Sequence, residues 1–228
     1  MKNCGALSAA VRRFFKAAVK TSFVGFMFFK QVKMRGDNLS YVIADEETKE
    51  TAVVDPGFDS DEIKNLLGTE NLRLIYVINT HDHVDHVASE DALKLRFGAK
   101  TVSHRLSNHA TDVRVDEGDV LRVGSIFIRV LYTPGHTVDS ICLLIDGKKL
   151  LTGDTLLAGT VRNTILASGD SRSLYESLFG KILKLSDEVE VFPGHERGGR
   201  VSSTIGEEKR VNRALQARSY AEFVELIK

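Results

Sequence analysis

The 228-residue chain is long enough for one or two domains, and 43% of its residues are hydrophobic, which is enough for a sizeable core. Its 31 basic residues balance its 31 acidic residues, so no overall field would attract nucleic acid or an anionic membrane. The two cysteines exclude a disulfide framework and a thiolate metal cluster. We therefore expect a single domain over residues 27–228, in a reducing cytoplasm.

The N-terminal segment breaks this balance, because residues 1–36 include many lysines and arginines but no acidic residue. Its apolar run at 23–29 is too short to span a bilayer as a helix, and a secretory cleavage site is missing. A basic, amphipathic segment without acids fits a mitochondrial transit peptide. The alternatives, which we favour, are an extra helix or upstream sequence before a true start at Met27. Residues 1–26 are thus expected to be an extension of the domain.

Short runs rich in β-branched residues begin the predicted fold. In chain order we expect strands at 38–45 and 51–55, a helix at 59–68, a strand at 72–79, a helix at 89–97 and a strand at 100–103. Asp59 or Ser60 would cap the first helix. The run at 72–79 is continuously apolar, which indicates a strand buried on both faces.

The second half of the chain repeats this order. We expect strands at 119–123, 126–132, 140–146 and 148–152, a helix at 171–185, a strand at 188–192, and helices at 205–217 and 218–227. Gly147 would lie in a hairpin turn, and Thr204 with Glu207 predicts a capping box. Strand and helix groups in both halves favour an α/β fold of two sheets packed face to face with helices outside.

Four loops that follow strand-like runs carry the chemistry: THDHVDH, TPGHT, TGD and PGH. Their residues of metal-ligand type are His81, His83, Asp85, His86, His136, Asp154 and His195. A strand end aims a side chain into a cleft from a rigid backbone. Each residue alone has an ordinary packing or turn role as its alternative, but the shared placement predicts a metal site. His104 and His109 lack this placement, so we interpret them as surface or packing residues.

The ligand types narrow the choice of metal. Imidazole and carboxylate without thiolate suit Zn²⁺, Fe²⁺ or Mn²⁺. A zinc-bound water has a pKa near ~7, and two ions about 3.5–4 Å apart can clamp a substrate and its leaving group. Asp55, at the end of TAVVD, is placed to orient a ligand imidazole, with a turn before Pro56 as the alternative.

Taken together, the four motifs resemble the signature of the metallo-β-lactamase superfamily over about residues 38–196. This resemblance implies the αβ/βα sandwich, with two mixed sheets and the metals at one edge. It also implies two metal sites joined by a bridging carboxylate: His81, His83 and His136 in the first, Asp85, His86 and His195 in the second, and Asp154 between them. Asp85 and Asp154 are then the candidate catalytic carboxylates.

Two branches of the superfamily are similar to the chain. Glyoxalase II hydrolyses glutathione thioesters at a dinuclear site, for which two Zn²⁺ ions are expected here. Persulfide dioxygenase oxidises glutathione persulfide at one Fe²⁺, whose ligands would be His81, His136 and Asp154. Two histidines and one carboxylate with open positions are typical of non-haem iron oxygenases.

Both ends of the matched region favour the dioxygenase. FFKQV at 28–32 and RVSSTIGEEKRVNRAL at 200–215 are similar to that family's opening and ending. The printed sequence ends at Lys228, whereas glyoxalase II continues with a helical domain. We therefore expect a persulfide dioxygenase, with the zinc hydrolase as the alternative and an RNA-processing nuclease of the superfamily as a distant one.

Two positions depart from the dioxygenase pattern. The expected Arg-Thr-Asp is Arg162-Asn163-Thr164, and the expected His-Asp-Tyr is His195-Glu196-Arg197, without the tyrosine. Arg162 remains a candidate for binding a substrate carboxylate, with a solvated arginine as the alternative.

The expected partner is a small thiol-derived substrate. We expect neither nucleic acid nor a membrane as a partner, because the charges balance. A homodimer is the alternative to a single chain. The expected compartment is the cytoplasm, or the mitochondrion if the basic N-terminus is a transit peptide.

Overall fold

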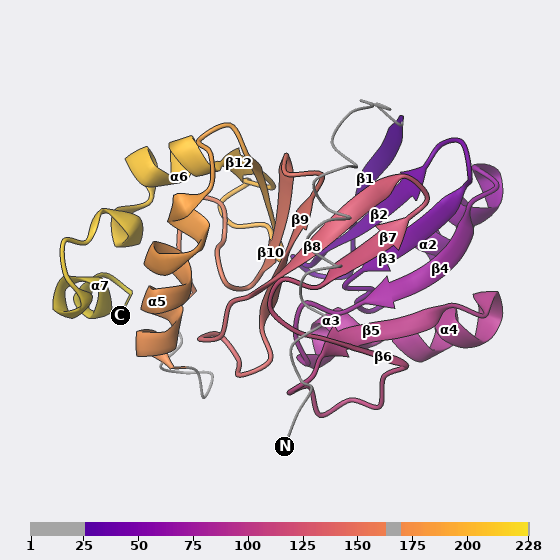
Figure 1. Cartoon of the computed structure of the whole chain (residues 1–228), viewed down its shortest axis with the longest axis horizontal. Coiled ribbons are helices and arrows are strands. Elements are labelled where there is room, and N and C mark those ends of the chain that lie inside the picture. The colour runs from indigo at the N-terminus through magenta and orange to yellow at the C-terminus, as the bar shows by residue number, and fades with distance from the viewer. Residues whose placement is uncertain (1–25, 163–169, 228) are drawn as a thin grey trace, which may run out of the picture.

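The N-terminal half of the chain builds the first sheet of a computed structural model that describes residues 26–162 and 170–227 (Figure 1). Its strands lie side by side in sequence order: β1 (Met27–Lys33), β2 (Leu39–Asp45), β3 (Glu50–Val54), β4 (Arg73–Ile78), β5 (Lys100–His104) and β6 (Val113–Val115). β1 to β3 pair antiparallel, whereas β3 to β6 pair parallel. The sheet is mixed, as predicted.

The second sheet runs in the order β12-β11-β10-β9-β8-β7. Its strands are β7 (Val120–Val123), β8 (Ile126–Tyr132), β9 (Ile141–Ile145), β10 (Lys149–Gly153), β11 (Glu190–Pro193) and β12 (Ser203–Thr204). β10 and β11 pair parallel and the other neighbours antiparallel. Asp146 (φ 48°) and Gly147 (φ 70°) form the predicted hairpin turn, since a two-residue type I′ turn needs positive φ at both positions.

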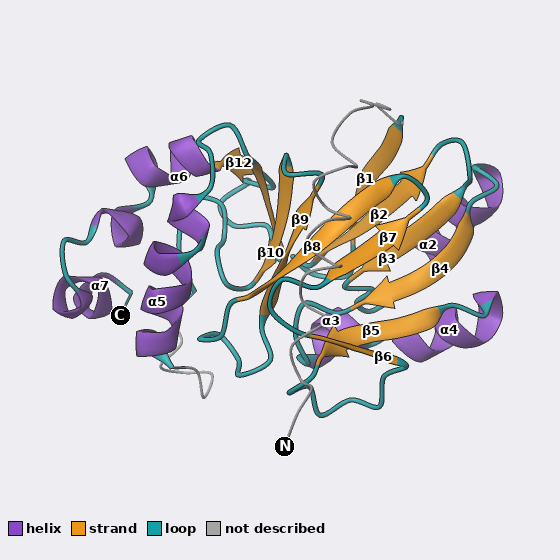
Figure 2. Cartoon of the chain, viewed as in Figure 1, coloured by secondary structure: helices purple, strands orange, loops and turns teal. Residues whose placement is uncertain are grey.

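Helices cover the outer faces of the two sheets (Figure 2). The helices are α2 (Asp61–Thr69), α3 (Val84–Val87), α4 (Glu90–Phe97), α5 (Ser171–Gly180), α6 (Ile205–Val211) and α7 (Tyr220–Leu226). α2 and α4 pack on the first sheet, while α5, α6 and α7 pack on the second. None of the helices in the described ranges is long and apolar enough to cross a membrane.

Three apolar clusters hold these layers together. β2 shows how one strand serves two of them, because its alternate side chains point to opposite faces. Tyr41 and Ile43 lie in the cluster between the sheets, whereas Val42 and Ala44 lie in the cluster under α2 and α4. The third cluster lies between the second sheet and α5 to α7. The fold class is thus the predicted sandwich with helices outside.

Two predicted helices are shorter than expected. The helix predicted at 171–185 ends at Gly180, where Lys181 (φ −123°, ψ −63°) leaves the helical region before a 3₁₀ turn at Ile182–Lys184. The helix predicted at 205–217 ends at Val211, because Asn212 has an extended ψ of 106°. Thr204 does cap this helix, since its hydroxyl accepts from Glu207 N at 3.1 Å, while the Glu207 carboxylate pairs with Arg200 at 2.5 Å.

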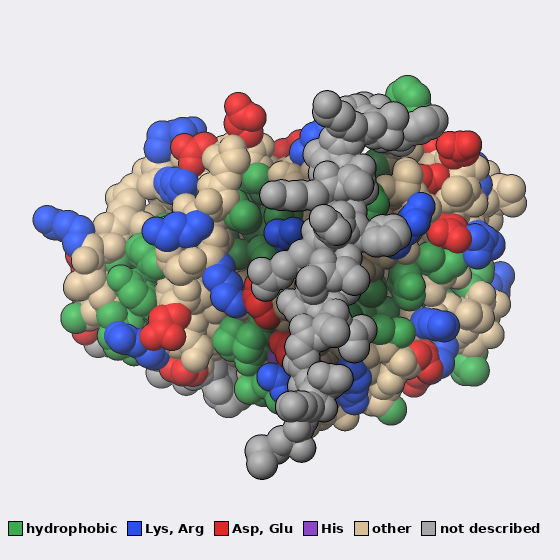
Figure 3. All heavy atoms as spheres, viewed as in Figure 1, with side chains coloured by type: hydrophobic (Ala, Val, Ile, Leu, Met, Phe, Trp, Pro, Cys, Tyr) green, Lys and Arg blue, Asp and Glu red, His purple; other side chains and the backbone are tan. Residues whose placement is uncertain are grey.

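Four of the elements named above were not predicted as such: β1, β6, β12 and α3. The proposed extension at 1–26 lies outside the described residues up to position 25, so the domain boundary stays a prediction. In Figure 3, Lys and Arg side chains are interspersed with Asp and Glu side chains on the visible face.

Candidate metal centre

The ligand loops leave the two sheets at the same edge of the sandwich. His81 follows β4 of the first sheet, and the other three loops follow β8, β10 and β11 of the second. The donor atoms form two groups, each with all members within 4.8 Å of one another. We call these the first group (His81, His83, His136 and Asp154) and the second group (Asp85, His86 and His195). All seven predicted ligand residues therefore meet.

In the first group, three ring nitrogens surround one point. Nδ1 of His83 is 3.0 Å from Nε2 of His81 and 3.0 Å from Nε2 of His136. Oδ2 of Asp154 is 3.4 Å from Nε2 of His136. Ligands that hold one ion at roughly 2.0–2.2 Å must lie about 3 Å apart, so this spacing fits a metal ion.

The second group lies on the other side of Asp154. Nε2 of His195 is 3.1 Å from Nε2 of His86 and 3.5 Å from Oδ2 of Asp85. Oδ1 of Asp154 is 3.4 Å from Nε2 of His195 and 3.7 Å from Nε2 of His86. Asp154 thus directs one carboxylate oxygen to each group.

Unpaired polar atoms test whether these residues fit a metal. Oδ1 of Asp154 is buried and has no hydrogen-bond partner among the described residues. A buried carboxylate oxygen without a partner is costly. A cation between the imidazoles and Asp154 would remove that cost, so the donor set fits a divalent ion.

The protonation states of the first group suit metal binding. Burial lowers the pKa of His81 well below its ordinary value, and burial lowers the pKa of His136 to about 4. Both rings are therefore neutral at neutral pH and offer a lone pair. Burial raises the pKa of Asp154, but the His195 ring 3.4 Å from its Oδ1 and the charge of His86 hold this pKa well below its ordinary value.

His86 of the second group behaves differently. Burial lowers its pKa, but the Asp55 carboxylate beside it outweighs burial and raises the pKa to about 9. A metal ion that binds His86 must therefore displace a proton.

Asp55 holds one ring of each group through direct or relayed contacts. Its Oδ2 is 3.1 Å from Nδ1 of His86 and accepts from the Thr80 hydroxyl at 2.7 Å. That hydroxyl oxygen is 3.1 Å from Nδ1 of His81. Because a carboxylate only accepts, the Nδ1 atoms carry the protons and the Nε2 atoms face the centre.

Asp37 and Asn38 were missed by sequence reasoning. Nδ1 of His195 lies 3.1 Å from Oδ1 of Asp37, and Asn38 donates to Oδ2 of Asp85 at 3.1 Å. Asp37 precedes the strand predicted at 38–45 and Asn38 begins it, so neither residue follows a strand end as the predicted ligands do. Thr80, inside the THDHVDH motif, was missed as well.

Arg162 reaches the first group. Its Nη1 contacts Oδ2 of Asp154, and its side chain is 31% exposed. Arg197, where the resemblance leads us to expect a tyrosine, lies with Nη1 3.5 Å from Oδ2 of Asp37. Asn163 and Thr164 lie outside the described residues.

His104 and His109 belong to neither ligand group. The His104 ring stacks on Tyr132 with centroids 4.2 Å apart, and its Nε2 lies 3.4 Å from Asp116. It is a packing residue, as predicted.

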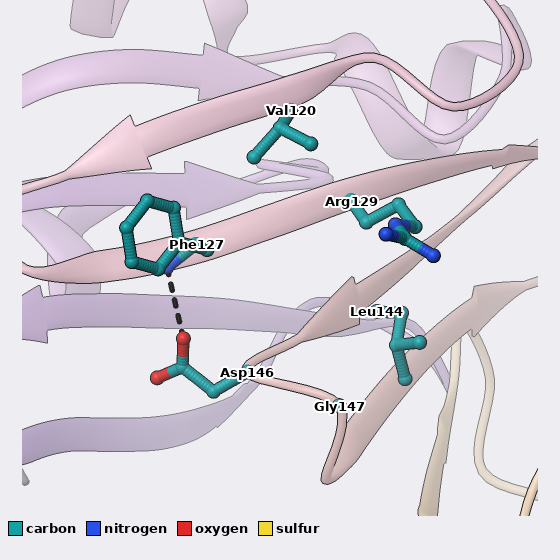
Figure 4. Close-up of a pocket in the computed structure, with 6 residues that line it drawn as sticks. All are labelled: Val120, Phe127, Arg129, Leu144, Asp146 and Gly147. Atoms are coloured by element: carbon teal, nitrogen blue, oxygen red, sulfur yellow. Dashed lines mark hydrogen bonds between the residues drawn. The ribbon is translucent and has the colours of Figure 1, made fainter. Parts of the chain in front are cut away.

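Figure 4 shows the residues that line a surface hollow of about 470 Å³. Its lining comes from β7, β8, β9 and the hairpin turn: Val120, Phe127, Arg129, Leu144, Asp146 and Gly147. The hollow contains no residue of either ligand group.

Residues 35–195 match the family model of the metallo-β-lactamase superfamily. The chain belongs to this superfamily. It is 32% identical over 195 residues to mitochondrial persulfide dioxygenase ETHE1 of Homo sapiens, which covers 82% of this chain and 75% of that relative. The crystal structure of ETHE1 from Myxococcus xanthus superposes with a TM-score of 0.84 and 35% identity, over 88% of this chain and 90% of that one.

A second kind of relative is also similar. The β-lactamase hydrolase-like protein of Xylella fastidiosa (strain 9a5c) is 32% identical over 234 residues. The match covers 84% of this chain but only 53% of that protein.

Proposed function

We propose that the chain is a persulfide dioxygenase that oxidises a low-molecular-weight persulfide at one iron ion. The observation that carries this proposal is its similarity to two ETHE1 proteins along most of each chain. The ligand groups support it, because His81, His136 and Asp154 supply the two imidazoles and one carboxylate that such iron sites use.

The iron, when bound, supplies the redox chemistry through which O₂ oxidises the persulfide sulfur. The protein's part is to hold neutral imidazoles and an ionised carboxylate in fixed positions. His81, His136 and Asp154 are each no more than 2% exposed, so their donor atoms are kept from bulk water. His83 and Arg162 are only half-buried, and the substrate therefore enters from their side.

Arg162 binds the substrate's carboxylate in this proposal. Its contact with Asp154 fixes one side of the guanidinium. A guanidinium has five N–H donors in a planar fork, so its other side can take a carboxylate. A persulfide of a thiol that carries carboxylates, such as glutathione, is the substrate class that fits.

Oxygen uptake tests the proposal directly. The chain should be loaded with Fe²⁺ without oxygen, then given glutathione persulfide in an oxygen electrode. We expect oxygen to be consumed in proportion to the persulfide. No uptake with any persulfide, together with rapid cleavage of a glutathione thioester by the zinc form, would reject the dioxygenase.

A hydrolase at a dinuclear zinc site is the second candidate. The complete second group favours it, because Asp85, His86 and His195 each have a positioning partner. Two zinc ions would then supply an acidic water and a clamp for the substrate. Thioester cleavage that needs two zinc ions per chain would support this candidate.

The compartment and the oligomeric state stay predictions. The human relative is named as mitochondrial, which supports the transit-peptide interpretation of the basic N-terminus over a cytoplasmic one. Import of the full chain into isolated mitochondria tests it.

A further inference from the structure

The turn between β1 and β2 lies against the segment that carries His195. Leu39 N donates to Gly194 O at 2.8 Å, and Glu196 N donates to Asp37 O at 2.7 Å. Asn38 and His195 form a β-bridge between these two bonds. The backbone of the turn is therefore fixed relative to His195 on both sides.

This backbone places the Asp37 carboxylate beside the ring of His195. Oδ1 of Asp37 is 3.1 Å from Nδ1 of His195. Arg197 holds the other oxygen, with Nη1 3.5 Å from Oδ2. The side chain of Asp37 is 47% exposed, so the carboxylate lies at the rim of the centre.

We propose that Asp37 is a positioning residue for the second ligand group, and that it sets His195 to bind a second divalent ion. A hydrogen bond at one imidazole nitrogen fixes which nitrogen remains for a metal. Because Asp37 accepts from Nδ1–H, Nε2 keeps its lone pair. That nitrogen faces Oδ2 of Asp85 at 3.5 Å and Nε2 of His86 at 3.1 Å.

Asp37 and Asp55 differ in the ligand groups that they contact. Asp55 contacts His86 directly and His81 through Thr80, so it serves both groups. The contact of Asp37 with a ligand side chain is with His195, in the second group. A change at Asp37 should therefore separate the two metal positions. This inference goes beyond the one-iron chemistry of the proposed function, which uses residues of the first group.

Zinc titration of metal-free protein tests the proposal. We compare wild type, Asp37→Ala and Asp37→Asn by calorimetry and by competition with a chromophoric chelator. We expect two zinc ions per wild-type chain. Asp37→Ala should lower the affinity for the second zinc ion by about 10–100-fold and leave the affinity for the first within about twofold of wild type. Asp37→Asn should lose less affinity for the second zinc ion, because its amide oxygen still accepts a hydrogen bond from Nδ1–H of His195.

Glu196→Ala is the matched control. Glu196 lies between His195 and Arg197, but its carboxylate pairs with Lys33 at 2.8 Å. This variant should bind both zinc ions as wild type does.

Three results would overturn the proposal: two zinc ions bound by Asp37→Ala with wild-type affinity, an equal loss of both ions, or only one zinc ion in the wild type. None of these bears on persulfide oxidation, which is measured as oxygen uptake by the iron form. Failure of this inference and failure of the proposed function are therefore distinguishable.

Discussion

Asp55 shows at the scale of one residue how a carboxylate organises the centre. It accepts from Thr80 N and from the Thr80 hydroxyl, both at 2.7 Å, and lies 3.1 Å from His86. Its φ of 51° is in the left-handed region, which Asp tolerates better than most residues. A side chain held in this way fixes the orientation of the His86 ring directly and of the His81 ring through Thr80.

The change Asp55→Asn should weaken metal binding at both positions. An amide has one acceptor oxygen, so it cannot serve Thr80 and His86 as the carboxylate does. We expect a loss of about 10–100-fold in zinc affinity, measured by chelator competition. Asp91→Asn, on the exposed face of α4, is the control. Wild-type affinity in Asp55→Asn would contradict the positioning role.

Arg162 leads to a prediction about substrate choice. Lysine keeps the positive charge but loses the planar fork. Arg162→Lys should raise KM for glutathione persulfide about tenfold. A persulfide without carboxylates should be affected much less. Equal losses for both substrates would indicate that Arg162 acts only through its contact with Asp154.

At the scale of elements, β1 packs against strands of both sheets. Phe29 packs against Tyr41 of β2 and Phe192 of β11, with ring centroids 5.8 and 4.7 Å apart. The Tyr41 hydroxyl donates to Pro193 O, at the end of β11, at 2.5 Å. β1 therefore supports both the core and the turn that carries Asp37 and Asn38.

Two truncations distinguish β1 from the segment before it. Removal of residues 1–25 should leave metal content and oxygen uptake within about twofold of the full chain, because all ligands lie downstream. Removal of residues 1–33 should cause loss of the folded protein, since it deletes β1 and exposes apolar core. Circular dichroism measures whether each truncated chain is folded, and metal analysis measures its metal content. Unfolding on the shorter truncation would show that residues 1–25 are structural.

Asp45 connects the end of β2 to the turn between β7 and β8. It accepts from Ser125 N at 2.8 Å and from Thr48 N at 2.7 Å. Burial raises its pKa, but the hydrogen bonds from Ser125 and Thr48 outweigh burial and hold the pKa well below its ordinary value. The carboxylate thus stabilises the contact between the two sheets when it is ionised.

This lowered pKa predicts how stability depends on pH. The stabilisation is complete above the unfolded pKa of about 4 and is lost as the pH falls toward the folded pKa. Asp45→Asn should lower the free energy of unfolding by about 1–3 kcal/mol at pH 7, and by less at pH 3. Urea unfolding measures both, with the exposed Glu46→Gln as control. An equal difference at both pH values would contradict this account.

At the scale of the whole molecule, strand ends explain what the sequence could predict. The ligand residues follow β4, β8, β10 and β11, so their convergence follows from apolar runs and the residues after them. Asp37 and Asn38 carry no such signal, because only folding brings the start of β2 beside His195. The helix breaks at Lys181 and Asn212 depend on local backbone angles that the apolar pattern does not encode.

Arg197 illustrates the same limit. The sequence identifies it only as a departure from the dioxygenase pattern. In the folded chain it lies beside Asp37, which in turn contacts His195. Arg197 is thus connected to the His195 ring through Asp37, a residue that is distant in sequence.

The most direct test of one-iron dioxygenase chemistry compares three iron-loaded proteins: wild type, His195→Ala and His81→Ala. Oxygen uptake with glutathione persulfide and iron per chain should be measured on the same samples. We predict that His195→Ala keeps most of the wild-type rate with one iron per chain, because His195 belongs to the second group, whereas His81→Ala loses both. The account would be contradicted if His195→Ala lost its oxygen uptake as completely as His81→Ala, or if iron-loaded wild type consumed no oxygen.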